Sequence, residues 1–166
     1  MTENEIGTIL LDTAVAVHRQ LGPGLLESVY EIVMAYELEQ RGLRAERQVP
    51  ISIVYKSMTF AEAFRADLLV ADRVLVELKS VEQINMAHRK QIQTYLRLTG
   101  LKLGYILNFG AALMKEGIVR AVNGLEDDRN DSRGDAEKQL ESLAQRRQDA
   151  EKSQRKTKSQ SPEERP

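Results

Sequence analysis

The sequence predicts an α/β domain over residues 1–125, followed by a charged tail. Two segments before residue 42 repeat apolar residues at helical spacing. Short apolar runs that suit β-strands follow, and a third helical segment interrupts them near residue 90. Such a succession of helices and strands is typical of folds in which helices cover a sheet.

The two N-terminal helices are indicated mainly by their ends. Thr2 and Glu5 form a capping-box pattern at the start of the first helix, which ends at residues 22–24, Gly-Pro-Gly. The second helix is predicted from Leu25 to Arg41, where Gly42 is a natural stop. The residues expected on its apolar side are Leu26, Val29, Tyr30, Val33 and Leu38.

One further helix and several strands complete the predicted domain. We expect a strand at Pro50–Tyr55, a helix at about Asn85–Leu98, and strands at Leu103–Phe109 and Ile118–Val122. Composition then changes, because residues 126–166 hold few apolar residues and many charged ones. Such a segment cannot bury enough apolar area to offset its ordering entropy, so we expect a disordered or transiently helical tail.

Composition limits the class of protein. The chain has no cysteine, which excludes disulfides and thiolate metal sites. No run reaches the roughly 18 apolar residues of a membrane span, and a cytoplasmic location is expected. Residues 1–125 contain 14 Lys and Arg against 14 Asp and Glu, so their net charge is zero. Domains that bind duplex DNA tightly are usually more basic.

The segment from Ala66 to Lys79 predicts a tight β-hairpin. The apolar faces expected are Ala66, Leu68 and Val70 on its first strand and Val74, Val76 and Leu78 on its second. A three-residue turn at 71–73 aligns these faces and sets Asp67 opposite Glu77. A slip of one residue would move polar groups into the apolar layer, so burial selects this register.

The polar face of this hairpin indicates a metal site. Directly opposed residues have Cβ atoms about 4.5–5.5 Å apart, where two carboxylates repel unless a cation neutralises them. Mg²⁺ prefers carboxylate oxygens and keeps several waters. Lys79 lies two residues beyond Glu77 on the same face, where its amine can orient a water or stabilise charge on a phosphate.

An exposed sheet face is the alternative for these residues. Lys79 would then be only the local counter-charge of Asp67 and Glu77. Leu69 and Leu75 share the face of the charged residues, which indicates that this face is partly covered.

The motifs of the chain resemble those of a known family. Residues 24–30, GLLESVY, match a GxxExxY signature, and residues 47–50, RQVP, follow it. Asp67 and the Glu-Leu-Lys of residues 77–79 come next, then His88, Gln91 and Tyr95, and finally residues 107–110, LNFG. In this order and spacing, over about residues 4–123, the chain resembles the GxxExxY proteins of the PD-(D/E)XK nuclease superfamily.

The resemblance implies a restriction-endonuclease-like fold, with a mixed β-sheet flanked by helices. The ligands that it implies for Mg²⁺, or Mn²⁺, are Asp67, Glu77 and the carbonyl of Leu78. Lys79 would be the catalytic lysine, Glu27 would act through the metal or its water, and Gln91 would contact substrate or orient Lys79. Glu27 also suits the first turn of a helix, where the helix dipole favours an acid.

The expected activity is metal-dependent hydrolysis of phosphodiester bonds in DNA or RNA. The alternative is a catalytically silent module that binds nucleic acid or protein with the same fold, and the tail could bind a protein partner. For His88, one turn before Gln91, a surface or packing role is favoured over a place in the site.

Overall fold

The computed structural model describes residues 1–125, and the predicted tail, residues 126–166, lies outside the described residues. Five strands form one sheet in the order β1-β2-β3-β4-β5. Neighbouring strands are antiparallel except β3 and β4, which are parallel. The elements are α1 (Glu3–Leu21), α2 (Glu27–Gln40), β1 (Ala45–Tyr55), β2 (Met58–Val70), β3 (Val74–Lys79), α3 (Met86–Thr99), β4 (Leu103–Asn108), the short 3₁₀ helix η1 (Met114–Glu116) and β5 (Ile118–Val122).

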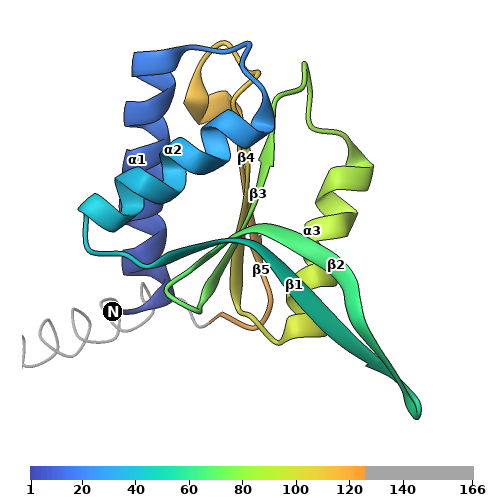
Figure 1. Ribbon diagram of the computed structural model, residues 1–166. Coiled ribbons are helices and arrows are strands. Elements are labelled where there is room, and N and C mark those ends of the chain that lie inside the picture. Colours follow the sequence, from blue (N-terminus) through green and yellow to red (C-terminus); the bar gives the residue numbers. More distant parts are fainter. Residues whose placement is uncertain (126–166) are drawn as a thin grey trace, which may run out of the picture. The chain divides into compact units, whose positions relative to one another are not determined.

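The helices cover both faces of the sheet, which confirms the predicted architecture. Helices α1 and α2 lie on one face and α3 on the other (Figure 1). On β3, Val76 and Leu78 pack under α1 and α2, whereas Leu75 packs under α3. Glu77 and Lys79 share the α3 side of β3 with Leu75, because side chains alternate along a strand. None of the helices in residues 1–125 is long and apolar enough to cross a bilayer.

The predicted hairpin register is confirmed for residues 68–70 against 74–76, but the predicted pair of Asp67 with Glu77 is not part of the ladder. Leu68 pairs with Val76 and Val70 pairs with Val74. The turn at residues 71–73 closes when the Arg73 N–H donates to the carbonyl of Val70 over 3.1 Å. This register fixes which residues of β2 and β3 approach one another at the far end of the hairpin.

The shared face predicted for Ala66, Leu68 and Val70 is wrong at Ala66. Ala66 packs in the core under α3, whereas Leu68 and Val70 pack under α1 and α2. The break lies at Asp67, where the β1–β2 ladder skips the pair with Gln48. Gln48 has a left-handed φ of 51°, so regular strand alternation does not continue through this point.

Strands β1 and β2 are longer than predicted. β1 begins at Ala45 rather than Pro50, and β2 begins at Met58 rather than Ala66. Figure 1 shows the two strands continuing as an arm away from the rest of the sheet. In the arm, β1 alternates between half-buried and exposed side chains from Val49 to Val54, whereas residues 58–63 of β2 are all exposed. The start of β2 therefore lacks the alternation that marks a half-buried strand.

The apolar side predicted for the second helix is also partly wrong. Leu26 is the residue before α2 and is 74% exposed, and Val29 is 37% exposed. The buried stripe instead runs through Tyr30, Met34 and Leu38, which are fully buried at a spacing of four residues. Helix α2 therefore begins at Glu27, with its first turn at the edge of the protein where β3 ends.

Asn108 joins the carboxyl ends of the two parallel strands. Its side chain is buried and donates to the carbonyl of Val81 over 2.8 Å. Its Oδ1 accepts the N–H groups of Val81, at 3.0 Å, and Gly110, at 3.1 Å. These bonds hold the segment that follows Lys79 against the end of β4.

Replacing Asn108 should therefore destabilise the protein and loosen this edge. Asn108→Ala leaves buried backbone groups of Val81 and Gly110 unpaired, and we expect a loss of about 2–4 kcal/mol in unfolding free energy. Urea unfolding measures this loss, and Asn123→Ala, which removes a less buried amide bonded to the Leu96 and Leu101 carbonyls, is the comparison. Equal losses for both variants would contradict a special role for Asn108.

Candidate active site at the end of strand β3

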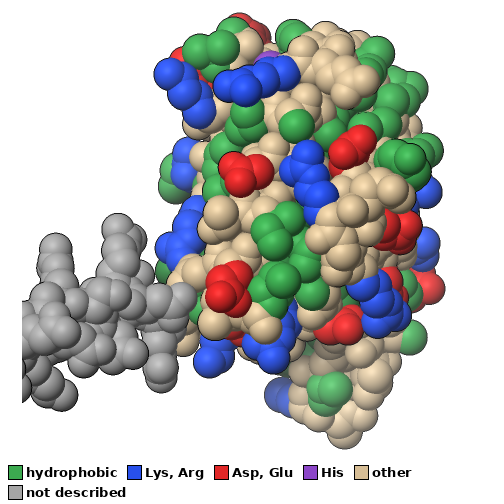
Figure 2. Space-filling model, turned by 90° about the vertical axis from the view of Figure 1, so that its left-hand side faces the viewer, with side chains coloured by type: hydrophobic (Ala, Val, Ile, Leu, Met, Phe, Trp, Pro, Cys, Tyr) green, Lys and Arg blue, Asp and Glu red, His purple; other side chains and the backbone are tan. Residues whose placement is uncertain are grey.

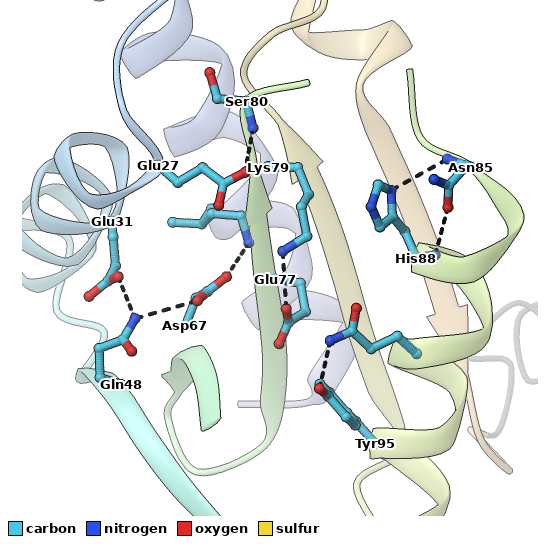
Figure 3. Close-up of polar contacts among 12 residues, drawn as sticks. Glu27, Glu31, Gln48, Asp67, Glu77, Lys79, Ser80, Asn85, His88 and Tyr95 are labelled. Atoms are coloured by element: carbon cyan, nitrogen blue, oxygen red, sulfur yellow. Dashed lines mark hydrogen bonds and ion pairs between the residues drawn. The ribbon is translucent and has the colours of Figure 1, made fainter. Parts of the chain in front are cut away.

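Asp67 is anchored where β2 and β3 separate. The regular pairing of the two strands ends at Leu68 and Val76. At the next position the Asp67 Oδ2 accepts the Leu78 N–H over 2.8 Å, so a side chain replaces the backbone partner (Figure 3). Burial raises the pKa of Asp67, and the charges of Glu31 and Glu27 raise it further against the Leu78 bond and Lys79.

Glu77 is a buried acid whose carboxylate is only partly hydrogen-bonded. The residue is 4% exposed, and its Oε1 has no hydrogen-bond partner among the described residues. Its Oε2 lies 3.4 Å from the Nζ of Lys79, a long contact for an ion pair. Burial, and then the charge of Asp67, raise the pKa of Glu77 from 4.5 to about 7, and Lys79 only partly opposes them.

Glu27 ties the start of α2 to the end of β3. Its Oε1 accepts the N–H of Ser80 over 2.9 Å, and the Ser80 Oγ donates to the Leu25 carbonyl over 2.8 Å. Figure 3 shows the Glu27 carboxylate beside β3, above Asp67. The structure therefore brings Glu27 and Asp67 close to Lys79, the last residue of β3.

Gln91 lies on α3, and its partner is not Lys79. Its Nε2 donates to the hydroxyl of Tyr95 over 2.6 Å. The Tyr95 ring stacks on Phe64 of the arm, with the ring centroids 3.6 Å apart. Within residues 1–125 no hydrogen bond joins Gln91 to Lys79, so its role towards that lysine stays a prediction.

His88 caps helix α3 at its first turn. Its Nδ1 accepts the N–H of Asn85 over 3.4 Å, while the Asn85 Oδ1 accepts the N–H of His88 over 3.1 Å. This reciprocal pair is a capping box at the first turn of the helix. The sequence favoured a surface or packing role for His88, and this helix-capping contact is a structural role of that kind.

Three residues near Asp67 were not predicted as part of the site. Glu31, on α2, is 5% exposed, and its Oε1 accepts from the Nε of Arg47 over 2.8 Å. The Gln48 Nε2 donates to the Glu31 Oε2 over 2.6 Å and reaches the Asp67 Oδ1 at 3.4 Å. The sequence does contain a signal for them. Glu31 follows Glu27 by one helical turn, and Arg47 and Gln48 begin the RQVP motif of residues 47–50.

The residues present fit a hard divalent cation. Asp67 and Glu77 offer carboxylate oxygens, and the Glu77 Oε1 is a buried acceptor that lacks a donor. Among the described residues no group of three or more His, Cys, Asp or Glu is arranged to hold a metal ion. Two carboxylates would thus need the Leu78 carbonyl or water to complete the ligand set, which suits Mg²⁺ because it retains several waters.

The buried Glu77 predicts a pH-dependent stability in the metal-free protein. Folded Glu77 keeps its proton up to about pH 7, whereas the unfolded chain loses it near pH 4.5. The folded state therefore binds more protons in this window, and the free energy of unfolding falls as the pH rises through it. In EDTA, Glu77→Gln should exceed wild type in stability by about 3 kcal/mol at pH 8.

The same comparison should show nearly equal stabilities below pH 4.5, where Glu77 is protonated in both the folded and the unfolded state. Urea unfolding of both proteins across this pH range is the measurement. A difference between them that stays constant with pH would show that the Glu77 charge is not desolvated in the folded protein.

Comparison with known proteins places these residues in a family. Residues 4–121 match the PD-(D/E)XK nuclease superfamily, and this segment covers more than half of the chain. No curated protein and no solved structure matches the chain. Nucleases of this superfamily generally use divalent metals such as Mg²⁺. The match contains Asp67, Glu77 and Lys79, and the five-stranded sheet with its three helices agrees with it. The chain therefore belongs to the PD-(D/E)XK nuclease superfamily.

Proposed function

We propose that this protein is a metal-dependent nuclease of the GxxExxY group that hydrolyses phosphodiester bonds of DNA or RNA. The observation that carries the proposal is Glu77, a buried acid with one unpartnered oxygen, beside Asp67 and Lys79. The GLLESVY motif and its Glu27 support the assignment to the GxxExxY group. A cytoplasmic location fits the absence of cysteine.

Asp67 and Glu77 would hold Mg²⁺ or Mn²⁺, with the Leu78 carbonyl as a further ligand. A bound ion would neutralise the two acids and stabilise charge that develops on the phosphate. Asp67 is suited to this task because the Leu78 N–H already fixes one of its oxygens. Glu77 is suited because no protein donor in the described region occupies its Oε1.

Lys79 would act on the phosphate or on the attacking water. Its side chain is 17% exposed, so it is mostly covered but still in contact with solvent. An ammonium group has three donors, and the 3.4 Å contact with Glu77 uses one of them. Glu27 uses Oε1 for Ser80, which leaves the second oxygen of the carboxylate to accept a hydrogen bond from water. Gln91 would contact the substrate from α3.

Lys79→Ala should abolish cleavage while metal binding persists, because the variant removes a donor to the reacting groups and leaves Asp67 and Glu77 in place. The assay is cleavage of labelled single-stranded and duplex DNA and RNA with Mg²⁺ or Mn²⁺, together with calorimetric titration of the metal. Lys102→Ala, at the opposite end of β4, is the matched control. Full activity of Lys79→Ala would remove this lysine from the mechanism.

The acid variants separate the nuclease from a silent binding module. Asp67→Ala should lose both metal binding and cleavage if the two acids hold the ion. A wild-type protein that binds nucleic acid with no dependence on divalent metal, and that Asp67→Ala leaves unchanged, would favour the silent module instead.

Residues 1–125 have zero net charge, but only some of their Lys and Arg side chains form an ion pair with an acid. Acidic and basic side chains are interspersed on the α1 side of the molecule (Figure 2). Arg19 and Lys115 have no ion-pair or hydrogen-bond partner among the described residues. They line a cavity of about 270 Å³ whose other lining residues are Val15, His18, Leu113 and Met114.

This cavity lies at the edge of the sheet where β3 and β4 end. The His18 Nε2 contacts the carbonyl of Ala111, three residues past β4, over 2.9 Å. Lys79 pairs with Asn108 at the last position of the parallel ladder, so the backbone of Lys79 lies at the same edge, while its amine turns back towards Glu77. With two cations and no acid on its wall, the cavity suits a phosphate of the substrate backbone.

A pair of double variants tests this contact with the substrate. Arg19→Gln with Lys115→Gln should weaken binding of a DNA or RNA oligonucleotide and lower the salt slope of log Kd by about 2. Arg97→Gln with Lys102→Gln changes the net charge equally at the opposite edge, and it should have little effect. Equal effects of the two double variants would assign the binding to net charge alone.

A further inference from the structure

One amide group links two carboxylates beside the proposed metal site. The Gln48 Nε2 lies 2.6 Å from the Glu31 Oε2 and 3.4 Å from the Asp67 Oδ1 (Figure 3). Both neighbours are acceptors, so the nitrogen rather than the oxygen of the amide must face them. The amide therefore lies between two negative groups that repel one another.

The backbone of Gln48 has a conformation that is unfavourable for glutamine. Its φ is 51°, in the left-handed region that L residues other than Asn and Asp rarely adopt. Such a residue persists where its surroundings determine it, and these outliers gather at functional sites. Here the left-handed turn interrupts the β1–β2 ladder directly opposite Asp67 and brings the side chain to both acids.

Glu31 anchors the amide without adding a free charge to the site. Its Oε1 is taken by Arg47 and its Oε2 by Gln48, and the residue is buried. Each oxygen of Glu31 therefore already has a protein donor, as the two oxygens of Asp67 do. The contribution of Glu31 is to hold Gln48, and Arg47 balances its charge.

We propose that Gln48 is a positioning residue of the metal site. The Leu78 N–H holds the Oδ2 of Asp67 and the Gln48 amide restrains its Oδ1, so the carboxylate is oriented from both sides before a cation arrives. The inference rests on the proposed function, in which Asp67 binds metal. Partners that orient a ligand in this way typically contribute 10–100-fold to metal affinity or activity.

Gln48→Gly tests the contribution of the Gln48 side chain without adding backbone strain. Glycine adopts a positive φ without steric cost, so the variant removes the amide and relieves the backbone at once. In the full-length protein we expect a Mn²⁺ affinity about 10-fold lower or more by calorimetry. In cleavage assays at fixed Mn²⁺, kcat should fall more than the KM for the oligonucleotide rises.

Lys56→Gly is the matched control, because Lys56 also has a left-handed φ, 54°, and lies in the turn between β1 and β2, far along the chain from Asp67. It should leave Mn²⁺ affinity unchanged. Gln48→Asn is the second variant: asparagine tolerates this φ but is one methylene shorter, so it should also lose affinity. Wild-type Mn²⁺ affinity in both Gln48 variants would overturn the inference while leaving the proposed function standing.

A wild-type protein that binds no metal would instead remove the proposed function, and the link between Gln48 and Asp67 is then tested without metal. In EDTA, the Tm shifts of Gln48→Gly and Asp67→Asn should fail to add in the double variant, because the two residues are in contact. Additive shifts would overturn the positioning role.

Discussion

The site is governed by the repulsion among four carboxylates that the fold gathers around the end of one strand. Three of them have a protein donor: Glu27 accepts from Ser80, Asp67 from Leu78, and Glu31 from both Arg47 and Gln48. Glu77 has only a long contact with Lys79, and one of its oxygens has no partner in the described region. The negative charge around Glu77 therefore favours binding of either a proton or a cation there. The other three acids of the group already have hydrogen-bond donors from the protein.

The topology explains why the acids meet. Parallel pairing of β3 with β4 requires a crossover, and α3 supplies it on the face that carries Glu77. The opposite face is covered by α1 and α2, so β3 is buried on both sides and its charges are desolvated. Because α2 begins at Glu27, at the edge where β3 ends, its first turn adds a carboxylate beside the strand. Burial and charge are thus imposed by the layers of the fold.

The hairpin could be predicted from sequence because two constraints agree there. Apolar alternation at residues 68–70 and 74–76 and a short turn select one register, and that register brings Asp67 to the end of β3. The network around Gln48 could not be predicted in the same way. Glutamine has no preference for a left-handed backbone, and residues 58–63 of β2 are all exposed, so neither propensity nor periodicity indicated the break opposite Asp67. The same break explains why Ala66 packs under α3 instead of under α1 and α2 with Leu68 and Val70.

The energetic cost of Glu77 separates the two functions that the fold could serve. A module that only binds a partner gains nothing from an acid that is 4% exposed and has one oxygen without a donor in the described region. A neutral side chain of similar size would pack there without the desolvation penalty. A hydrolytic site does gain, because an unsatisfied acceptor next to a second carboxylate attracts a cation and a nearby amine serves the phosphate. Where a sequence breaks a local rule of stability, function is the usual reason. The surrounding contacts agree with this explanation. Arg47 neutralises Glu31, whereas Glu77, which keeps an unpaired oxygen, lies beside Lys79.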